Sequence, residues 1–139
     1  MRILGLDVGT KTIGLAVSDP LGLTAQSLTT LRRSSLEEDL AALQKIIEEY
    51  EVEELMVGLP LNMNGTAGPS VDMAKEFGQA CADAFGLKIT YRDERLSTVA
   101  AERVLLEGDA SRKKRKQVID KLAAAYVLQG YLDYLSMQR

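Results

Sequence analysis

The chain has 139 residues and a net charge of −3, and its 46% hydrophobic and 27% charged residues are typical of one globular domain. It contains no histidine and a single cysteine, which excludes histidine-based catalysis, the common zinc sites and an internal disulfide. Any catalysis must use carboxylates, hydroxyls, Lys, Arg, Tyr or backbone groups. No apolar run is long enough to span a bilayer, and the chain opens directly on a strand. We therefore expect a cytoplasmic protein with no signal peptide and no membrane partner.

Short apolar segments separated by turns dominate the N-terminal half. They predict strands over 2–8, 13–19 and about 24–32, with 9–12 joining the first two as a hairpin. A helix capped by Ser34 or Ser35 is expected to run to about Tyr50. A buried strand over 54–58 and a loop over 59–69, rich in Gly, Pro and Asn, follow.

Helical periodicity is stronger in the second half. It predicts a helix over 70–85 ended by Gly86, a strand over 87–93 and a helix from Ser97 or Thr98 to Leu106. A polar, basic loop over 109–116 and a last helix over 117–135 complete the pattern. Antiparallel strands followed by crossover units predict an α/β fold with a mixed sheet. This element order matches the ribonuclease-H-like architecture, which implies a five-stranded sheet in the order 3-2-1-4-5. Helices would cover both faces of this ribonuclease-H-like architecture, in a single domain over 1–139.

Asp7 is the most informative residue because it lies in a strand that is otherwise almost entirely apolar. Alternation places Ile3, Gly5 and Asp7 on one face of this strand, and residues 4, 6 and 8 on the other. A strand with two apolar faces is usually buried, and a carboxylate there is costly unless a cation meets it. A bound metal ion would make Asp7 a functional residue.

Two other carboxylates are candidates to join Asp7. Glu94 follows a predicted parallel strand, at the edge where open α/β sheets place their sites, although a surface pair with Arg92 or Arg95 is the alternative. Asp120 heads a helix face that continues through Ala123 and Ala124, although an acid at a helix start is also common. Three converging carboxylates could hold one or two Mg²⁺ or Mn²⁺ ions and catalyse phosphodiester hydrolysis without histidine.

Several polar segments are candidates for substrate binding. The turn Gly9–Thr10–Lys11 offers backbone N–H groups, a hydroxyl and a cation beside Asp7. Asn62 and Gly65 belong to the long loop, and Arg95 and Ser97 follow Glu94. Residues 37–54 are strongly acidic, which indicates a solvated surface, whereas a basic run of five residues attracts phosphate. The basic run consists of Arg112, Lys113, Lys114, Arg115 and Lys116.

Four segments together resemble the YqgF (RuvX-type) family. They begin at Asp7 (DVGTK, then IGLAVSD), at Val57 (VGLPLNM), at Asp93 (DERLST) and at Asp120 (DKLAA), and they occur in the family's order. The family is described both as a pre-16S rRNA nuclease and as a Holliday junction resolvase. The resemblance implies a bacterial cytoplasmic nuclease that depends on Mg²⁺ or Mn²⁺, with its acidic site on Asp7, Glu94 and Asp120. Three positions depart from the family pattern and affect only the expected substrate contacts: Thr12, Asn64 and Ala67.

The sequence leaves several functions open. Processing of the 5′ end of pre-16S rRNA in ribosome biogenesis is the preferred hypothesis, and resolution of branched DNA is the second. A non-catalytic nucleic-acid-binding or ribosome-associated module and a sugar-kinase-like ATPase are the others. The ATPase hypothesis is disfavoured because such enzymes enclose nucleotide between two related domains. The sequence does not choose between a monomer and a homodimer.

Overall fold

The computed structural model describes residues 2–62, 64–94 and 112–138. For residues 112–121 it describes the backbone and not the side chains. Its strands form one sheet in the order β3-β2-β1-β4-β5, as predicted. β1 pairs antiparallel with β2 and parallel with β4, β2 pairs antiparallel with β3, and β4 pairs parallel with β5. The strands are β1 (Arg2–Val8), β2 (Thr12–Ser18), β3 (Ala25–Arg32), β4 (Val52–Leu59) and β5 (Lys88–Asp93).

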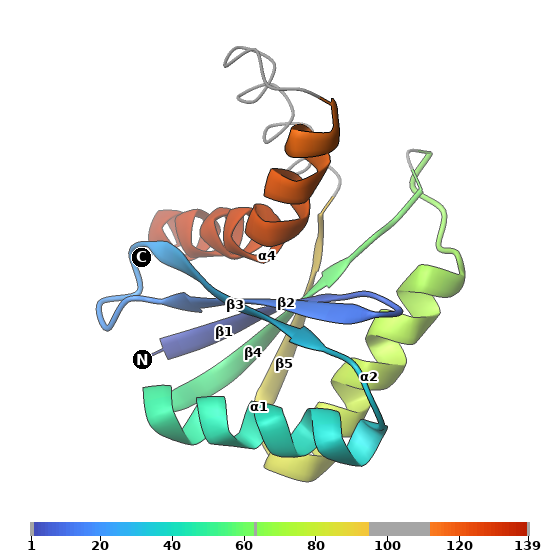
Figure 1. Cartoon of the computed structure of the whole chain (residues 1–139). Coiled ribbons are helices and arrows are strands. Elements are labelled where there is room, and N and C mark those ends of the chain that lie inside the picture. Colours follow the sequence, from blue (N-terminus) through green and yellow to red (C-terminus); the bar gives the residue numbers. More distant parts are fainter. Residues whose placement is uncertain (1, 63, 95–111, 139) are drawn as a thin grey trace.

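The described helices cover both faces of the sheet. Figure 1 shows α1 (Leu36–Tyr50) and α2 (Pro69–Phe85) on one side and α4 (Arg112–Met137) on the other. Ser35 caps α1 by accepting a hydrogen bond from the Glu38 N–H at 3.1 Å, as predicted. Gly86 ends α2 in the left-handed conformation, with φ of 67°. The helix predicted up to Leu106 lies outside the described residues.

Each face of the sheet has its own apolar core. Leu4, Leu6 and Val8 pack on the α1 and α2 side, whereas Ile3 packs on the α4 side with Leu128. The alternation predicted for β1 is therefore confirmed, and it places Asp7 on the face that α4 covers. Among the described helices, none is long and apolar enough to cross a membrane.

The basic run does not form the predicted loop. Residues 112–116 are the first turns of α4, which begins at Arg112 instead of near Gln117. Lys and Arg are good helix formers, and no Gly or Pro interrupts the chain before Gly130, so the helix continues through the charged segment. The prediction gave too much weight to polarity.

Candidate active site

Asp7 lies near the carboxyl end of β1, two residues beyond a point where α4 packs closely against the sheet. A Cβ added to Gly5 would lie 3.1 Å from the Leu128 Cβ and 3.4 Å from the Ala124 carbonyl oxygen. Gly5 therefore allows the helix to pack against the strand. Asp7 follows two residues later on the same face and is only partly buried. Its cross-strand partner in β2 is Gly14, which has no side chain to cover it.

Glu94 meets Asp7 from the end of β5. The Glu94 N–H donates to the Leu59 carbonyl at 3.2 Å, which continues the β4–β5 pairing past the end of the strand. A Cβ on Gly58 would overlap the Glu94 Oε2, so the absence of a side chain on β4 makes room for the carboxyl group. The Glu94 and Asp7 side chains are hydrogen-bonded to each other.

The environment of Glu94 favours its protonated form. Burial is the largest cause, followed by the charge of Asp7, the hydrogen bond with Asp7 and the charge of Asp93, and together they raise the pKa of Glu94 from 4.5 to about 8. Two carboxyl groups that share a proton are the arrangement expected when two like charges are held together without a cation. A divalent ion between them would favour ionisation of both groups.

Asp120 lies in α4, one helical turn before Ala124. Ala124 and Val127 are buried against the sheet, so the predicted apolar face of this helix is confirmed. The Asp120 side chain is outside the described residues. Among the side chains that are described, no three acidic, Cys or His residues form a group that could hold a metal ion. Of the three predicted ligands, the structure brings Asp7 and Glu94 together.

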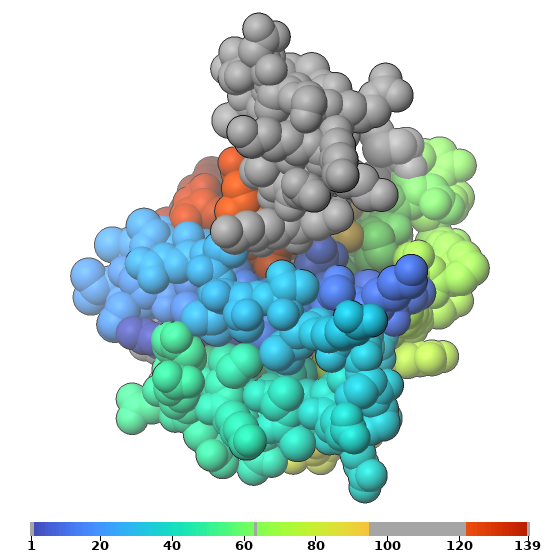
Figure 2. Space-filling view, viewed as in Figure 1, coloured from blue at the N-terminus to red at the C-terminus, as the bar shows by residue number. Residues whose placement is uncertain are grey.

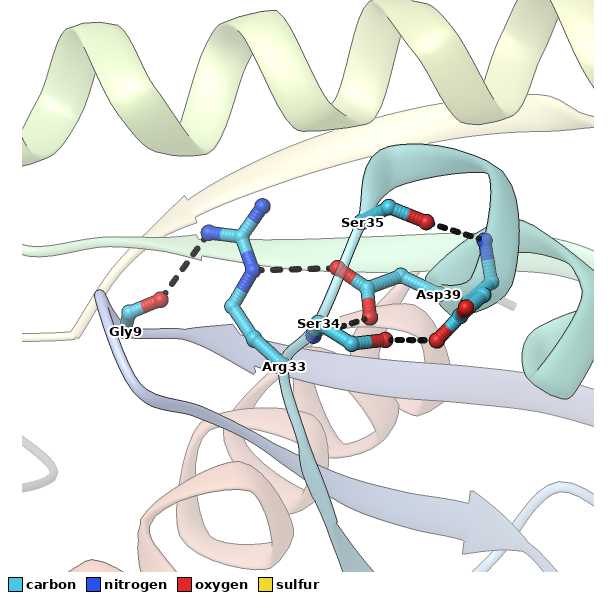
Figure 3. A network of polar contacts seen from close by, with 6 residues as sticks. Gly9, Arg33, Ser34, Ser35 and Asp39 are labelled. Carbon is cyan, nitrogen blue, oxygen red and sulfur yellow. Dashed lines mark hydrogen bonds and ion pairs between the residues drawn. The ribbon is translucent and has the colours of Figure 1, made fainter.

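The turn after β1 is fixed by an arginine that the sequence analysis did not select. The Gly9 N–H donates to the Thr12 carbonyl at 2.8 Å, and the Arg33 Nη1 donates to the Gly9 carbonyl at 3.0 Å. Arg33 also forms an ion pair with buried Asp39, with 3.3 Å between Nε and Oδ2 (Figure 3). The turn is therefore anchored to the start of α1, and Thr10 and Lys11 at its tip stay exposed.

The loop after β4 is stabilised by its own side chains. Asn62 Nδ2 donates to Thr66 Oγ1 at 3.0 Å, and the Asn64 Oδ1 accepts from the Thr66 backbone N–H at 3.1 Å. Gly65 adopts a φ of 87°, which favours glycine. Asn62 is exposed in this turn, at the same carboxyl end of the sheet as Asp7.

Two sets of predicted substrate contacts are not described at the side-chain level. Arg95 and Ser97 lie outside the described residues. The basic run is placed by its backbone at the start of α4, and its side chains are not described.

A second buried carboxylate fixes α4 to the sheet. Glu54 is 4% exposed and accepts hydrogen bonds from the Tyr131 hydroxyl at 2.6 Å and the Thr90 hydroxyl at 2.8 Å. Glu54 belongs to the strand predicted to be buried, whereas the interpretation of the acidic helix as a solvated surface is wrong for Asp39, which is also buried. All residues of β4 from Glu54 to Gly58 are buried, in agreement with the predicted buried strand.

The sheet order and the helices on both of its faces define a ribonuclease-H-like fold. Two solved structures share it over nearly the whole chain. One is Thermus thermophilus RuvC in complex with a Holliday junction substrate, with a TM-score of 0.60 and 19% identity, covering 99% of this chain and 96% of that one. The other is the fowlpox virus Holliday junction resolvase, with a TM-score of 0.56 and 15% identity, covering 96% of this chain and 99% of that one.

The chain belongs to the RuvX family, whose model, described as Holliday junction resolvase, matches residues 1–134. A Moorella thermoacetica relative is 61% identical over 97% of this chain and 96% of its own. A Clostridium botulinum relative is 57% identical over 98% of this chain and 99% of its own. Both carry the name "Putative pre-16S rRNA nuclease". The resemblance seen in the sequence is confirmed.

Proposed function

We propose that this protein is a divalent-metal-dependent endonuclease that hydrolyses phosphodiester bonds in nucleic acid. The hydrogen-bonded pair of Asp7 and Glu94 carries the proposal. Burial, followed by the neighbouring charge of Asp7, raises the pKa of Glu94, so holding these two carboxyl groups together is unfavourable without a cation. A raised pKa of Glu94 is expected if these two carboxyl groups are arranged to bind a cation.

The donor set fits a hard divalent ion. Asp7 and Glu94 offer carboxylate oxygens, which Mg²⁺ and Mn²⁺ prefer. Asp120 is the third proposed ligand, since it lies one turn before the residue that packs against Gly5. When bound, the metal would lower the pKa of a coordinated water and stabilise the leaving oxygen.

The chain's own groups would position the substrate. The backbone N–H groups and hydroxyl of the turn at Thr10, with the Lys11 ammonium, lie beside Asp7 and could hold the scissile phosphate. Arg33 keeps this turn in place through the Gly9 carbonyl. Arg95, Ser97, Asn62 and Gly65 are proposed to contact the nucleotides around it. The basic run at the start of α4 is proposed to grip flanking phosphates.

The proposed substrate is the 5′ region of precursor 16S rRNA, because relatives that are 57–61% identical over nearly their whole length carry that name. The second candidate is a four-way DNA junction, which the description of the family model favours. We propose a cytoplasmic location, where both nucleic acids occur in bacteria and a single thiol remains reduced.

A side-by-side cleavage assay tests this function. Precursor 16S rRNA with its 5′ leader and a four-way DNA junction would be incubated with the protein in Mg²⁺, in Mn²⁺ and in EDTA. We expect metal-dependent cleavage of the RNA at defined positions. Cleavage of the junction alone would assign the second function, and binding of either substrate without cleavage in any metal would show a non-catalytic module.

A further inference from the structure

An exposed basic cleft extends from the turn at Thr10 and Lys11 toward β3. Three of its lining residues, Thr12, Thr30 and Arg32, have no role in the chemistry described so far. Its volume is about 550 Å³. It is formed where the β1–β2 turn meets the carboxyl end of β3, and Figure 2 shows these two segments next to each other on the face in view. Its lining residues are Thr10, Lys11, Thr12, Thr30, Arg32 and Arg33.

Sheet register connects this cleft to Asp7. Asp7 pairs with Gly14 of β2, and Gly14 pairs with Thr30 of β3. Thr12 pairs with Arg32, two residues away from the Gly14–Thr30 pair on the same two strands. Directly paired residues share a face of a sheet, so the side chains of all four non-glycine residues start from the face that carries Asp7. Strand spacing places Thr30 and Arg32 about 10 to 12 Å from Asp7.

The charges in the cleft suit an anion. Among the described side chains, three cations and three hydroxyl groups line it, and no carboxylate does. Arg33 is already engaged by Asp39 and the Gly9 carbonyl, so it supports the cleft wall. Lys11 and Arg32 are exposed, and neither forms an ion pair with a described residue. Because Lys11 is proposed to hold the scissile phosphate, Arg32 is the cation that can neutralise a second one.

We propose that this cleft binds a backbone phosphate of the substrate strand beyond the scissile phosphate, with Arg32 as its main cation and Thr12 and Thr30 as hydroxyl donors. The inference rests on the proposed nuclease function, since it names how the same substrate is held. The ligand is a nucleic-acid phosphodiester, because the cations and hydroxyl groups of the cleft match a phosphate, and a phosphate contact carries no sequence information. Arg32 lies on the same face of the sheet as Asp7, so a phosphate held by Arg32 would direct the nucleic-acid strand from the cleft across Asp7 and Glu94.

Binding measurements on Arg32→Ala test the proposal. Fluorescence anisotropy would follow labelled precursor rRNA leader and labelled four-way junction, in an Asp7→Asn background so that no substrate is cleaved. Loss of one charged phosphate contact should weaken binding about tenfold. It should also lower the slope of log affinity against log salt by about 0.7 to 0.9. Arg32→Lys keeps the charge and should restore most of the affinity.

Lys45→Ala is the matched control, because Lys45 is an exposed cation on α1, on the opposite face of the sheet. Equal affinity and equal salt slopes for Arg32→Ala and Lys45→Ala would overturn the proposal. Metal-dependent cleavage by the otherwise unchanged protein would then still support the nuclease. Binding that depends on Arg32, without cleavage in any metal, would instead overturn the nuclease and support the cleft. Failure of the protein to bind either nucleic acid would overturn both.

Discussion

Replacing Gly58 with alanine should impair catalysis while leaving the fold intact. The new Cβ would overlap the Glu94 Oε2, whereas the Glu94 Cδ and Cβ would stay at 3.4 and 3.7 Å. Only the end of a flexible side chain has to move. Gly58 is also not among the described glycines with positive φ, so alanine can adopt its backbone conformation. The carboxyl group should turn aside by about 1 Å, a displacement that can cost about 100-fold in rate.

Single-turnover cleavage in Mn²⁺ measures this effect directly. A 100-fold loss corresponds to roughly 2.7 kcal/mol of activation free energy. Gly130→Ala is the matched control, because its Cβ would contact only the Arg92 Nη2 at 3.8 Å. That control should cleave normally and gain about 0.5 to 1 kcal/mol of stability from its helical position. Wild-type cleavage by Gly58→Ala would refute the role of Glu94, and its unfolding would refute the steric reasoning.

Three further predictions concern charge and burial. Because the pKa of Glu94 is about 8 in the folded protein and 4.5 when unperturbed, its contribution to metal-free stability is complete below pH 4.5 and is lost as the pH rises through about 8. The loss should amount to roughly 3 to 5 kcal/mol in urea unfolding, and Mn²⁺ affinity should rise over the same range as the proton leaves. Arg33→Met should lower the free energy of unfolding by about 3 kcal/mol, because it leaves Asp39 buried without its ion pair. Tyr131→Phe should cost about 2 kcal/mol by removing a 2.6 Å hydrogen bond to the buried carboxylate of Glu54.

Each of these predictions has its own control. Glu94→Gln cannot titrate, so its metal-free stability should lack the decline between pH 4.5 and 8, and persistence of that decline would assign it to other groups. Adding Asp39→Leu to Arg33→Met should recover part of the lost stability, and fully additive losses would contradict a coupled pair. Tyr134→Phe alters a side chain that is 48% exposed and should be neutral.

Local sequence patterns predicted most element ends because those features depend on local chemistry, and the strand order followed from matching the element order to a known architecture. The alternation of β1 separated Leu4 from Asp7, and Ser35 and Gly86 marked helix ends through capping and backbone preference. The same alternation placed Gly5 and Asp7 on one face, and in the structure α4 packs against this face at Gly5.

The features that were missed depend on side-chain contacts that the local sequence pattern does not show. The buried carboxylate of Glu54 accepts a hydrogen bond from Tyr131, 77 residues away, and nothing near Glu54 in the sequence identifies this partner. The sequence indicates that Asp39 is another exposed acid of a solvated helix, and only the structure shows its ion pair with Arg33. The use of Gly58 to accommodate the Glu94 carboxyl also needs three dimensions, since a glycine in a strand has several possible reasons.

The most direct test of the central claim compares the wild type with Asp7→Asn in one experiment that measures both binding and cleavage. Each protein would be mixed with labelled precursor 16S rRNA and with a four-way junction, in Mg²⁺ and in Mn²⁺. The account predicts that Asp7→Asn binds its substrate as tightly as the wild type and cleaves it at least 1,000-fold more slowly, as roughly expected when a metal ligand is lost. Cleavage by Asp7→Asn at the wild-type rate would contradict the assignment of the Asp7 and Glu94 pair as the active site.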